Sequence, residues 1–190
     1  MQKFVILSGI FLLIGLAACS SPEFKGTVMP EPLPVEDFTL IGKDAAAVSL
    51  SDFSDKLVLL YFGYTFCPDV CPTSMADLAK VQREMDDAGE NIQVVMVSVD
   101  PERDTPDKLA EYVEHFHPTF VGLTGTPTEI DKAGERYGLY YEIHEGTEAS
   151  GYLVDHTARI YVIQDGMYIH SFGFGTPWED IVNDLEILMK

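Results

Sequence analysis

The sequence predicts a mixed α/β fold in which a central β-sheet carries helices on both faces. Apolar runs of strand length alternate with amphipathic helical segments along the chain. Near the C-terminus, a turn signal at Asp165-Gly166 separates two strand-like runs, and a last helical segment over 177–189 follows them. The chain has 190 residues, of which 46% are hydrophobic, so it can bury the core of one domain.

The first strands and the first helix surround a pair of cysteines. Leu57–Tyr64 is an almost continuous apolar run, which is typical of a strand buried on both faces of a sheet. After the cysteines, apolar residues recur at helical spacing over 75–88, and Gly89 is suited to end that helix. Ile92–Asp100 predicts a second buried strand.

The remaining elements have clear start and stop signals. Thr105–Phe116 opens with threonine and proline, which suit the N-cap and the first helical position. A short strand is expected over 119–124, and Thr126–Gly138 repeats the Thr-Pro opening and closes on glycine. Ala158–Phe174 then predicts the two strands of the hairpin.

The N-terminus has the features of a targeting segment. Residues 1–18 combine Lys3 with a mostly apolar stretch that is shorter than the roughly 20 residues of a membrane span. The stretch ends in Leu16–Cys19 ("LAAC") and resembles the signal of a bacterial lipoprotein, which implies cleavage before Cys19 and lipidation of that residue. The alternative is an uncleaved membrane anchor. Either way we expect a membrane-anchored protein in the periplasm or on the outer face of the cell membrane.

Residues 19–34 are expected to be a flexible membrane tether, because they are rich in proline, glycine and serine and have no apolar period. The folded domain is expected over 35–190. The chain is acidic, with a net charge of −19. Such a charge argues against nucleic acid as a partner, since binding phosphates needs lysine and arginine to displace counterions.

The chemistry of the chain is expected at Cys67 and Cys71, within "GYTFCPDVCPTS" (63–74). With Cys19 used for anchoring, these two cysteines remain in an oxidising compartment. A disulfide staple across so short a loop gains little chain entropy, and dithiol oxidoreductases more often use C-x-x-C. The spacing of four residues allows both a disulfide and the binding of one ion, and it selects neither.

Two opposing local effects act on the Cys71 thiol, and the sequence does not rank them. Pro72 fits the first turn of the following helix, which places Cys71 at or beside the N-cap. Unpaired N–H groups and the helix dipole at that position lower the pKa of a thiol. The carboxylate of Asp69 would oppose this effect if it came near.

A metal site would need a third ligand, and His156 is the strongest candidate among five histidines. It lies in "YLVDHTARIYVI" (152–163), in the loop that enters a central strand. Two thiolates and an imidazole suit Cu(I) or zinc, and imidazole also suits Cu(II). Structural zinc sites usually have four ligands, so three favour copper. Asp155 would fix the tautomer of His156, or else cap a turn. The other four histidines are expected at a helix end, in an acidic exposed segment and on a sheet face (His115, His117, His144 and His170).

Three motifs in order resemble the Sco/SenC family of thioredoxin-like copper chaperones for cytochrome c oxidase assembly. They are "FGYTFCPDVCPTS" (62–74), "VSVDPERDTPDKL" (97–109) and "GYLVDHTARIYVI" (151–163), and the likeness covers about 34–190. The resemblance implies a thioredoxin-like fold and one copper ion, Cu(I) or Cu(II), bound by Cys67, Cys71 and His156. It further implies a metallochaperone, rather than an enzyme, that delivers copper to the CuA site in subunit II of cytochrome c oxidase or matures that site. Other copper carriers or thiol reductases would be further partners.

A second function remains open from the sequence. The pair Cys67 and Cys71 could belong to a thiol–disulfide oxidoreductase that reduces the cysteines of a partner and meets copper only incidentally. His156 distinguishes the two interpretations, because a dithiol reductant does not need a metal-binding imidazole.

Overall fold

The structure is a computed structural model and describes residues 23–147 and 151–190. In these ranges the strands are Thr27–Pro34 (β1), Thr39–Ile41 (β2), Ala47–Ser49 (β3), Leu57–Gly63 (β4), Ile92–Ser98 (β5), Val121–Leu123 (β6), Tyr141–His144 (β7), Leu153–His156 (β8), Arg159–Gln164 (β9) and Met167–Gly173 (β10). The α-helices are Val70–Glu84 (α1), Pro106–Phe116 (α2), Pro127–Gly134 (α3) and Trp178–Leu188 (α4). Short 3-10 helices span Lys43–Ala45, Leu50–Phe53, Asp86–Asn91 and Glu135–Tyr137.

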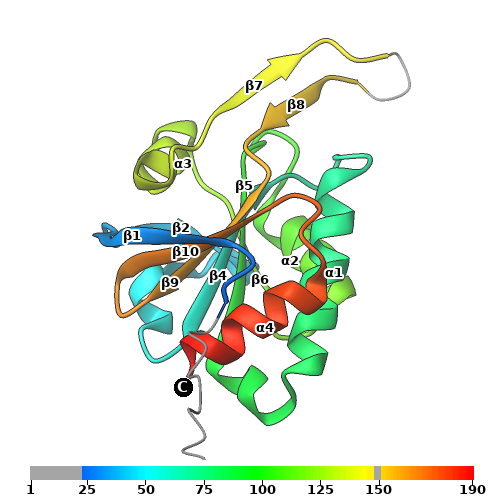
Figure 1. Cartoon of the computed structure of the whole chain (residues 1–190). Coiled ribbons are helices and arrows are strands. Elements are labelled where there is room, and N and C mark those ends of the chain that lie inside the picture. Colours follow the sequence, from blue (N-terminus) through cyan, green and yellow to red (C-terminus); the bar gives the residue numbers. More distant parts are fainter. Residues whose placement is uncertain (1–22, 148–150) are drawn as a thin grey trace, which may run out of the picture.

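A six-stranded mixed sheet in the order β1-β10-β9-β4-β5-β6 forms the centre of the molecule (Figure 1). β4, β5 and β6 run parallel, and β9 and β10 form an antiparallel hairpin. Every residue of β4 and β5 is buried, as their apolar sequences predicted. At the hairpin turn, Asp165 and Gly166 have φ of 51° and 71°, the left-handed conformation that a type I′ turn requires.

Successive residues of β4 show that helical segments cover both faces of the sheet. Tyr61 points to the side of α1, where Gly63 is close to both its ring and Cys71. Phe62, the next residue, contacts Tyr137 in the segment after α3, so it points to the other side. α1 and α4 pack against each other on the first side (Figure 1). The expected fold class is confirmed.

The N-terminal boundary of the domain differs from the expectation. Thr27–Pro34, predicted as tether, forms β1 and pairs with β10 at the edge of the sheet. Proline is tolerated there because one row of N–H groups on an edge strand faces solvent. The N–H groups of Lys25 and Gly26 also donate to the carboxylate of Asp184 in α4. Any tether must therefore end before Lys25.

Other boundaries also shift. α1 begins at Val70, ahead of Cys71, which was expected at or beside its N-cap, and it ends at Glu84, where a 3-10 helix continues to Asn91. The short hairpin of β2 and β3 was not expected, and β7 pairs with β8 in a second hairpin that extends from the body of the molecule (Figure 1). His156 ends β8 and so lies in a strand, not in a loop.

The predicted signal segment, with Cys19, lies outside the described residues. Among the residues that are described, no helix is both long enough and apolar enough to span a membrane.

Candidate metal centre

The two cysteines lie where β4 passes into α1. Asp69 is the N-cap of α1, and Cys71 is the second helical residue rather than the N-cap. Cys71 is fully buried, whereas Cys67 in the preceding loop is half-buried. Gly63 makes this packing possible, because a Cβ at that position would lie 3.0 Å from Cys71 Sγ and 2.7 Å from the ring of Tyr61. The two cysteines form no disulfide in the structure.

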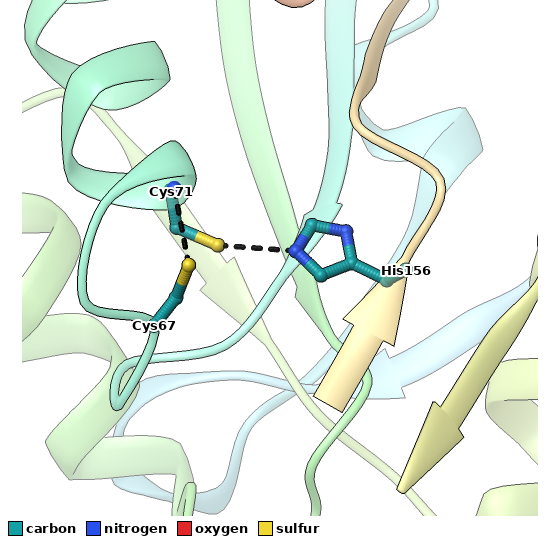
Figure 2. A group of neighbouring side chains, drawn as sticks. All are labelled: Cys67, Cys71 and His156. Atoms are coloured by element: carbon teal, nitrogen blue, oxygen red, sulfur yellow. Dashed lines mark hydrogen bonds between the residues drawn. The ribbon is translucent and has the colours of Figure 1, made fainter. Parts of the chain in front are cut away.

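His156 reaches the cysteines from the other side, carried by the β7–β8 hairpin (Figure 2). Its Nε2 lies 3.3 Å from Cys71 Sγ, although 85 residues separate the two in sequence. One ligand atom from each of Cys67, Cys71 and His156 lies within 4.8 Å of the others. The structure thus brings the three predicted ligands together, and within the described ranges no other such group of His, Cys, Asp and Glu is found.

The tautomer of His156 follows from its second nitrogen. Nδ1 lies 3.3 Å from the carbonyl oxygen of Thr157, which can only accept a hydrogen bond. Nδ1 therefore carries the proton, and the lone pair of Nε2 points toward Cys71. This tautomer is the one in which Nε2 can bind a metal ion.

Of the two roles expected for Asp155, the structure does not bear out the one of fixing the tautomer of His156. Its carboxylate lies 3.2 Å from Nε2 of His144 on β7, and its side chain is 76% exposed. Asp155 and His156 are successive strand residues, so their side chains point to opposite faces of the hairpin. The carbonyl of Thr157, a backbone group that no sequence motif reveals, takes the place of the carboxylate.

The two thiols differ in acidity, and the structure ranks them where the sequence could not. The pKa of Cys67 is lowered to about 3, chiefly by a hydrogen bond from the Cys71 thiol, and further bonds from backbone N–H groups help to outweigh the effect of burial. The pKa of Cys71 is raised, because it faces the Cys67 thiolate and is buried. The Cys71 N–H, from the first turn of α1, also donates to Cys67 Sγ over 3.4 Å. Cys67, not Cys71, thus gains from the helix N-terminus.

A model of the SCO1/SenC family matches residues 29–190. The chain belongs to the SCO1/SenC family. It is 36% identical over 152 residues to the mitochondrial SCO2 homolog of Mus musculus, a match that covers 78% of this chain and 60% of that protein. This SCO1/SenC chain therefore aligns with less than two thirds of that relative.

Solved structures of Sco proteins have the same fold. The apo Sco1 protein of Thermus thermophilus is 41% identical, with a TM-score of 0.78, and the match covers 87% of this chain and 97% of that one. Arabidopsis thaliana ScoI, solved with copper bound, is 35% identical, with a TM-score of 0.75 and coverage of 82% and 99%. The expected Sco/SenC membership and thioredoxin-like fold are confirmed.

The donor set of this SCO1/SenC protein fits copper on chemical grounds. A thiolate, a second thiol and a neutral imidazole with its lone pair turned inward are soft and borderline ligands, which copper prefers over the oxygen ligands of calcium or magnesium. Three protein ligands also leave one coordination position open. A donor from another molecule can enter there and begin ligand exchange.

Two tyrosines enclose the imidazole. The rings of Tyr61 and Tyr64 meet that of His156 edge-on, at centroid distances of 6.1 and 5.9 Å. The Tyr64 hydroxyl also accepts a hydrogen bond from the N–H of Val154 over 3.2 Å, which ties β8 to the end of β4. Burial raises the pKa of both tyrosines, so their hydroxyls remain protonated at neutral pH.

The other histidines lie away from the site, as expected. His115 and His117 end α2, His144 is on the outer hairpin, and His170 is fully buried against Asp184. The residues that sequence reasoning missed are Arg103, which lies over the ring of Phe66 in the cysteine loop, and Tyr152 of the hairpin, whose carbonyl accepts a bond from Arg103. The signal for Arg103 was the charged turn after a buried strand.

Proposed function

We propose that this chain is an extracytoplasmic copper metallochaperone that binds one copper ion through Cys67, Cys71 and His156. Its copper goes to the CuA site in subunit II of cytochrome c oxidase. The single observation that carries the proposal is the convergence of two sulfurs and an imidazole nitrogen within 4.8 Å of one another. Copper-bound Sco structures and a relative described as a member of a family of cytochrome c oxidase assembly proteins support it.

The unequal exposure of the sulfurs supports a mechanism of transfer. Cys67 is half-buried and Cys71 fully buried, and Phe66 beside Cys67 is 47% exposed. A thiolate of the partner therefore meets copper on the side of Cys67. Ligand exchange begins there, while Cys71 and His156 hold the ion until the partner has supplied its own ligands.

Membrane attachment completes the proposal. Lipidation of Cys19 would hold the domain at the membrane outside the cytoplasm, close to a membrane-bound oxidase. Since Lys25 and Gly26 are bonded to α4, the tether between lipid and domain would be only a few residues long.

A thiol–disulfide reductase is the second candidate, and the unequal acidity of the thiols favours it. The Cys67 thiolate would attack a disulfide of the partner and release one partner thiolate, forming a mixed disulfide. Cys71 would lose its proton and displace the second partner thiolate. The partner gains two electrons, and the Cys67–Cys71 disulfide that results must be reduced by a cellular thiol reductase.

Copper titration of the reduced full chain in detergent tests the first proposal. We expect one-to-one binding of Cu(I) and Cu(II), and a sulfur-to-Cu(II) charge-transfer band that Cys67→Ser and Cys71→Ser each abolish. His156→Ala should weaken binding, whereas His115→Ala, an exposed histidine on α2, should not.

A His156→Ala chain that binds copper like wild type would contradict the proposed ligand set. A chain that reduces a disulfide-containing CuA domain equally well with and without His156, but fails to load it with copper, would establish the reductase instead.

A further inference from the structure

The two parts of the copper site come from segments that are far apart. The cysteines belong to the body of the fold, whereas His156 is carried by the β7–β8 hairpin, which extends away from the sheet (Figure 1). A two-stranded hairpin alone is marginally stable. The position of His156 relative to the sulfurs therefore depends on the contacts that fasten this hairpin to the body.

The turn after β5 holds the cysteine loop in place. The carboxylate of Asp104, in the turn after β5, is fully buried and accepts hydrogen bonds from the N–H of Thr65 over 2.9 Å and from its hydroxyl over 2.5 Å. Ser98 donates to the same carboxylate over 2.7 Å. Thr65 lies two residues before Cys67, so this turn sets where the loop begins.

The same turn reaches the hairpin through Arg103. The guanidinium donates through Nε to Asp100 over 2.5 Å and through Nη1 to the carbonyl of Tyr152 over 2.9 Å. The Tyr152 hydroxyl donates to the other oxygen of Asp100 over 2.5 Å. These bonds join Asp100, Arg103 and Tyr152 in a closed ring, which we call the brace. Its member on the hairpin, Tyr152, lies four residues before His156.

Stacking adds a contact to the cysteine loop. The Arg103 guanidinium carbon lies 3.5 Å from the centre of the Tyr152 ring and 4.7 Å from that of Phe66, the residue before Cys67. The planar guanidinium can stack its flat face on a ring while its edge donates hydrogen bonds, whereas the ammonium of lysine has no flat face to stack. Arg103 is therefore the one side chain of the brace that contacts both halves of the site.

We propose that Arg103 is a positioning residue for copper binding, acting through His156. The inference rests on the proposed function, since copper is the ligand that His156 would bind. Besides the brace, the bond from Val154 to Tyr64 and the rings around His156 hold the start of β8 near the cysteines. Partners that orient metal ligands typically contribute 10–100-fold to metal affinity.

Copper competition titrations of the reduced full chain would measure this contribution. We expect Arg103→Ala and Arg103→Lys to lower copper affinity about tenfold or more. In the electron paramagnetic resonance spectrum of the Cu(II)-loaded chain, the nitrogen hyperfine structure from His156 should weaken in both variants. Arg83→Ala, which removes an exposed arginine from α1, is the matched control and should leave both properties unchanged.

The decisive comparison repeats Arg103→Ala in a His156→Ala chain. If Arg103 acts through the imidazole, its removal has almost no further effect there. Equal losses with and without His156, or no loss in the wild-type background, would overturn the inference. Failure of wild type to bind copper would instead overturn the proposed function.

The apo protein gives an independent test. Hydrogen exchange of the amides over 152–156 should be faster in Arg103→Ala than in Arg83→Ala, and unchanged exchange would contradict the brace. Arg103→Ala leaves the buried Asp100 carboxylate without its cation and could fail to fold. Tyr152→Phe then decides, because it removes only the bond to Asp100. We expect it to speed exchange over 152–156 and to lower copper affinity a few-fold, and no change in either would overturn the inference.

Discussion

His156 and His170 lie in two regions of the molecule where the same side chain has opposite surroundings. His156 is partly exposed at the end of the hairpin and bonds through Nδ1 to a backbone carbonyl, so its Nε2 faces the sulfurs with a free lone pair. His170 is fully buried in β10, and its Nε2 lies 2.8 Å from the carboxylate of Asp184. The first ring has a nitrogen available for a ligand, and the second has that nitrogen engaged with the protein.

The region around His170 fastens the start of the domain to its last helix. The carboxylate of Asp184 accepts bonds from the N–H groups of Lys25 and Gly26 as well as from His170. Burial alone would raise the pKa of Asp184, but these donors together lower it. A side chain at Gly26 would meet the ring of His170 at 2.3 Å, so only glycine allows this close approach.

The comparison shows that a histidine is a candidate ligand when no neighbouring carboxylate engages the ring nitrogen that would bind the metal. The buried bonds of Asp184 with His170, Lys25 and Gly26 hold β1 against the last helix. The histidine of the hairpin is only partly buried, and its Nε2 faces a sulfur rather than a carboxylate. Substitutions in the two regions should therefore separate stability from copper binding.

The largest effect is expected for Asp184→Ala. It leaves the N–H groups of Lys25 and Gly26 and the ring of His170 buried without their acceptor, which should lower the free energy of unfolding by about 3–5 kcal/mol. Urea unfolding measures this loss, and Glu186→Ala, an exposed position on the same helix, is the control. A change as small as that of the control would mean that the region is not a structural anchor.

His156→Ala should show the reverse pattern. We expect copper affinity to fall at least 100-fold, because a direct ligand is lost rather than one of its partners. The free energy of unfolding should change by less than about 0.5 kcal/mol, since the side chain is only partly buried. Competition titration and urea unfolding on one sample give both values. A large loss of stability in His156→Ala would remove the contrast with His170.

The next expected effect concerns the two sulfurs of the site, which should differ in acidity and therefore in reactivity. With its pKa near 3, Cys67 is a thiolate throughout the range from pH 4 to 9, whereas an ordinary thiol is mostly protonated below about pH 8. At pH 5 its alkylation by iodoacetamide should be roughly tenfold faster than that of an ordinary cysteine, after allowing for the weaker nucleophilicity of an acidic thiol. Cys71 should remain unmodified.

Mass spectrometry of the reduced apo chain over a range of pH would follow this alkylation. The chain unfolded in urea serves as the reference, since both cysteines should then titrate near their ordinary pKa. If modification of Cys67 in the folded chain has a midpoint near pH 8.5, the hydrogen bonds from the Cys71 thiol and the backbone do not stabilise its thiolate.

The smallest effect is expected for Asp155→Asn. The carboxylate faces His144 at the surface and not His156, so copper affinity should change less than twofold and stability by less than about 0.5 kcal/mol. The same titrations measure both. A loss near that of Arg103→Ala would restore the role that the sequence predicted for this residue.

Much of the fold could be predicted because its signals are local. The buried runs of β4 and β5, the Thr-Pro openings of α2 and α3, and the Asp165-Gly166 turn depend on residues close in sequence. β1 was missed because its prolines indicate a tether, and only pairing with β10, more than 130 residues later, makes it a strand. The early start of α1 was missed because the cysteine loop is short and its prolines suit several positions.

The sequence alone determined which atoms could bind a metal ion, namely two sulfurs four residues apart and one imidazole. It also determined the alternating pattern that brings them to one sheet edge. Only the tertiary structure decided which sulfur is the thiolate, which nitrogen of His156 is free, that Asp155 faces away and that Arg103 connects the two halves. These properties depend on burial and on hydrogen bonds between segments distant in the chain, and no local pattern of residues encodes either.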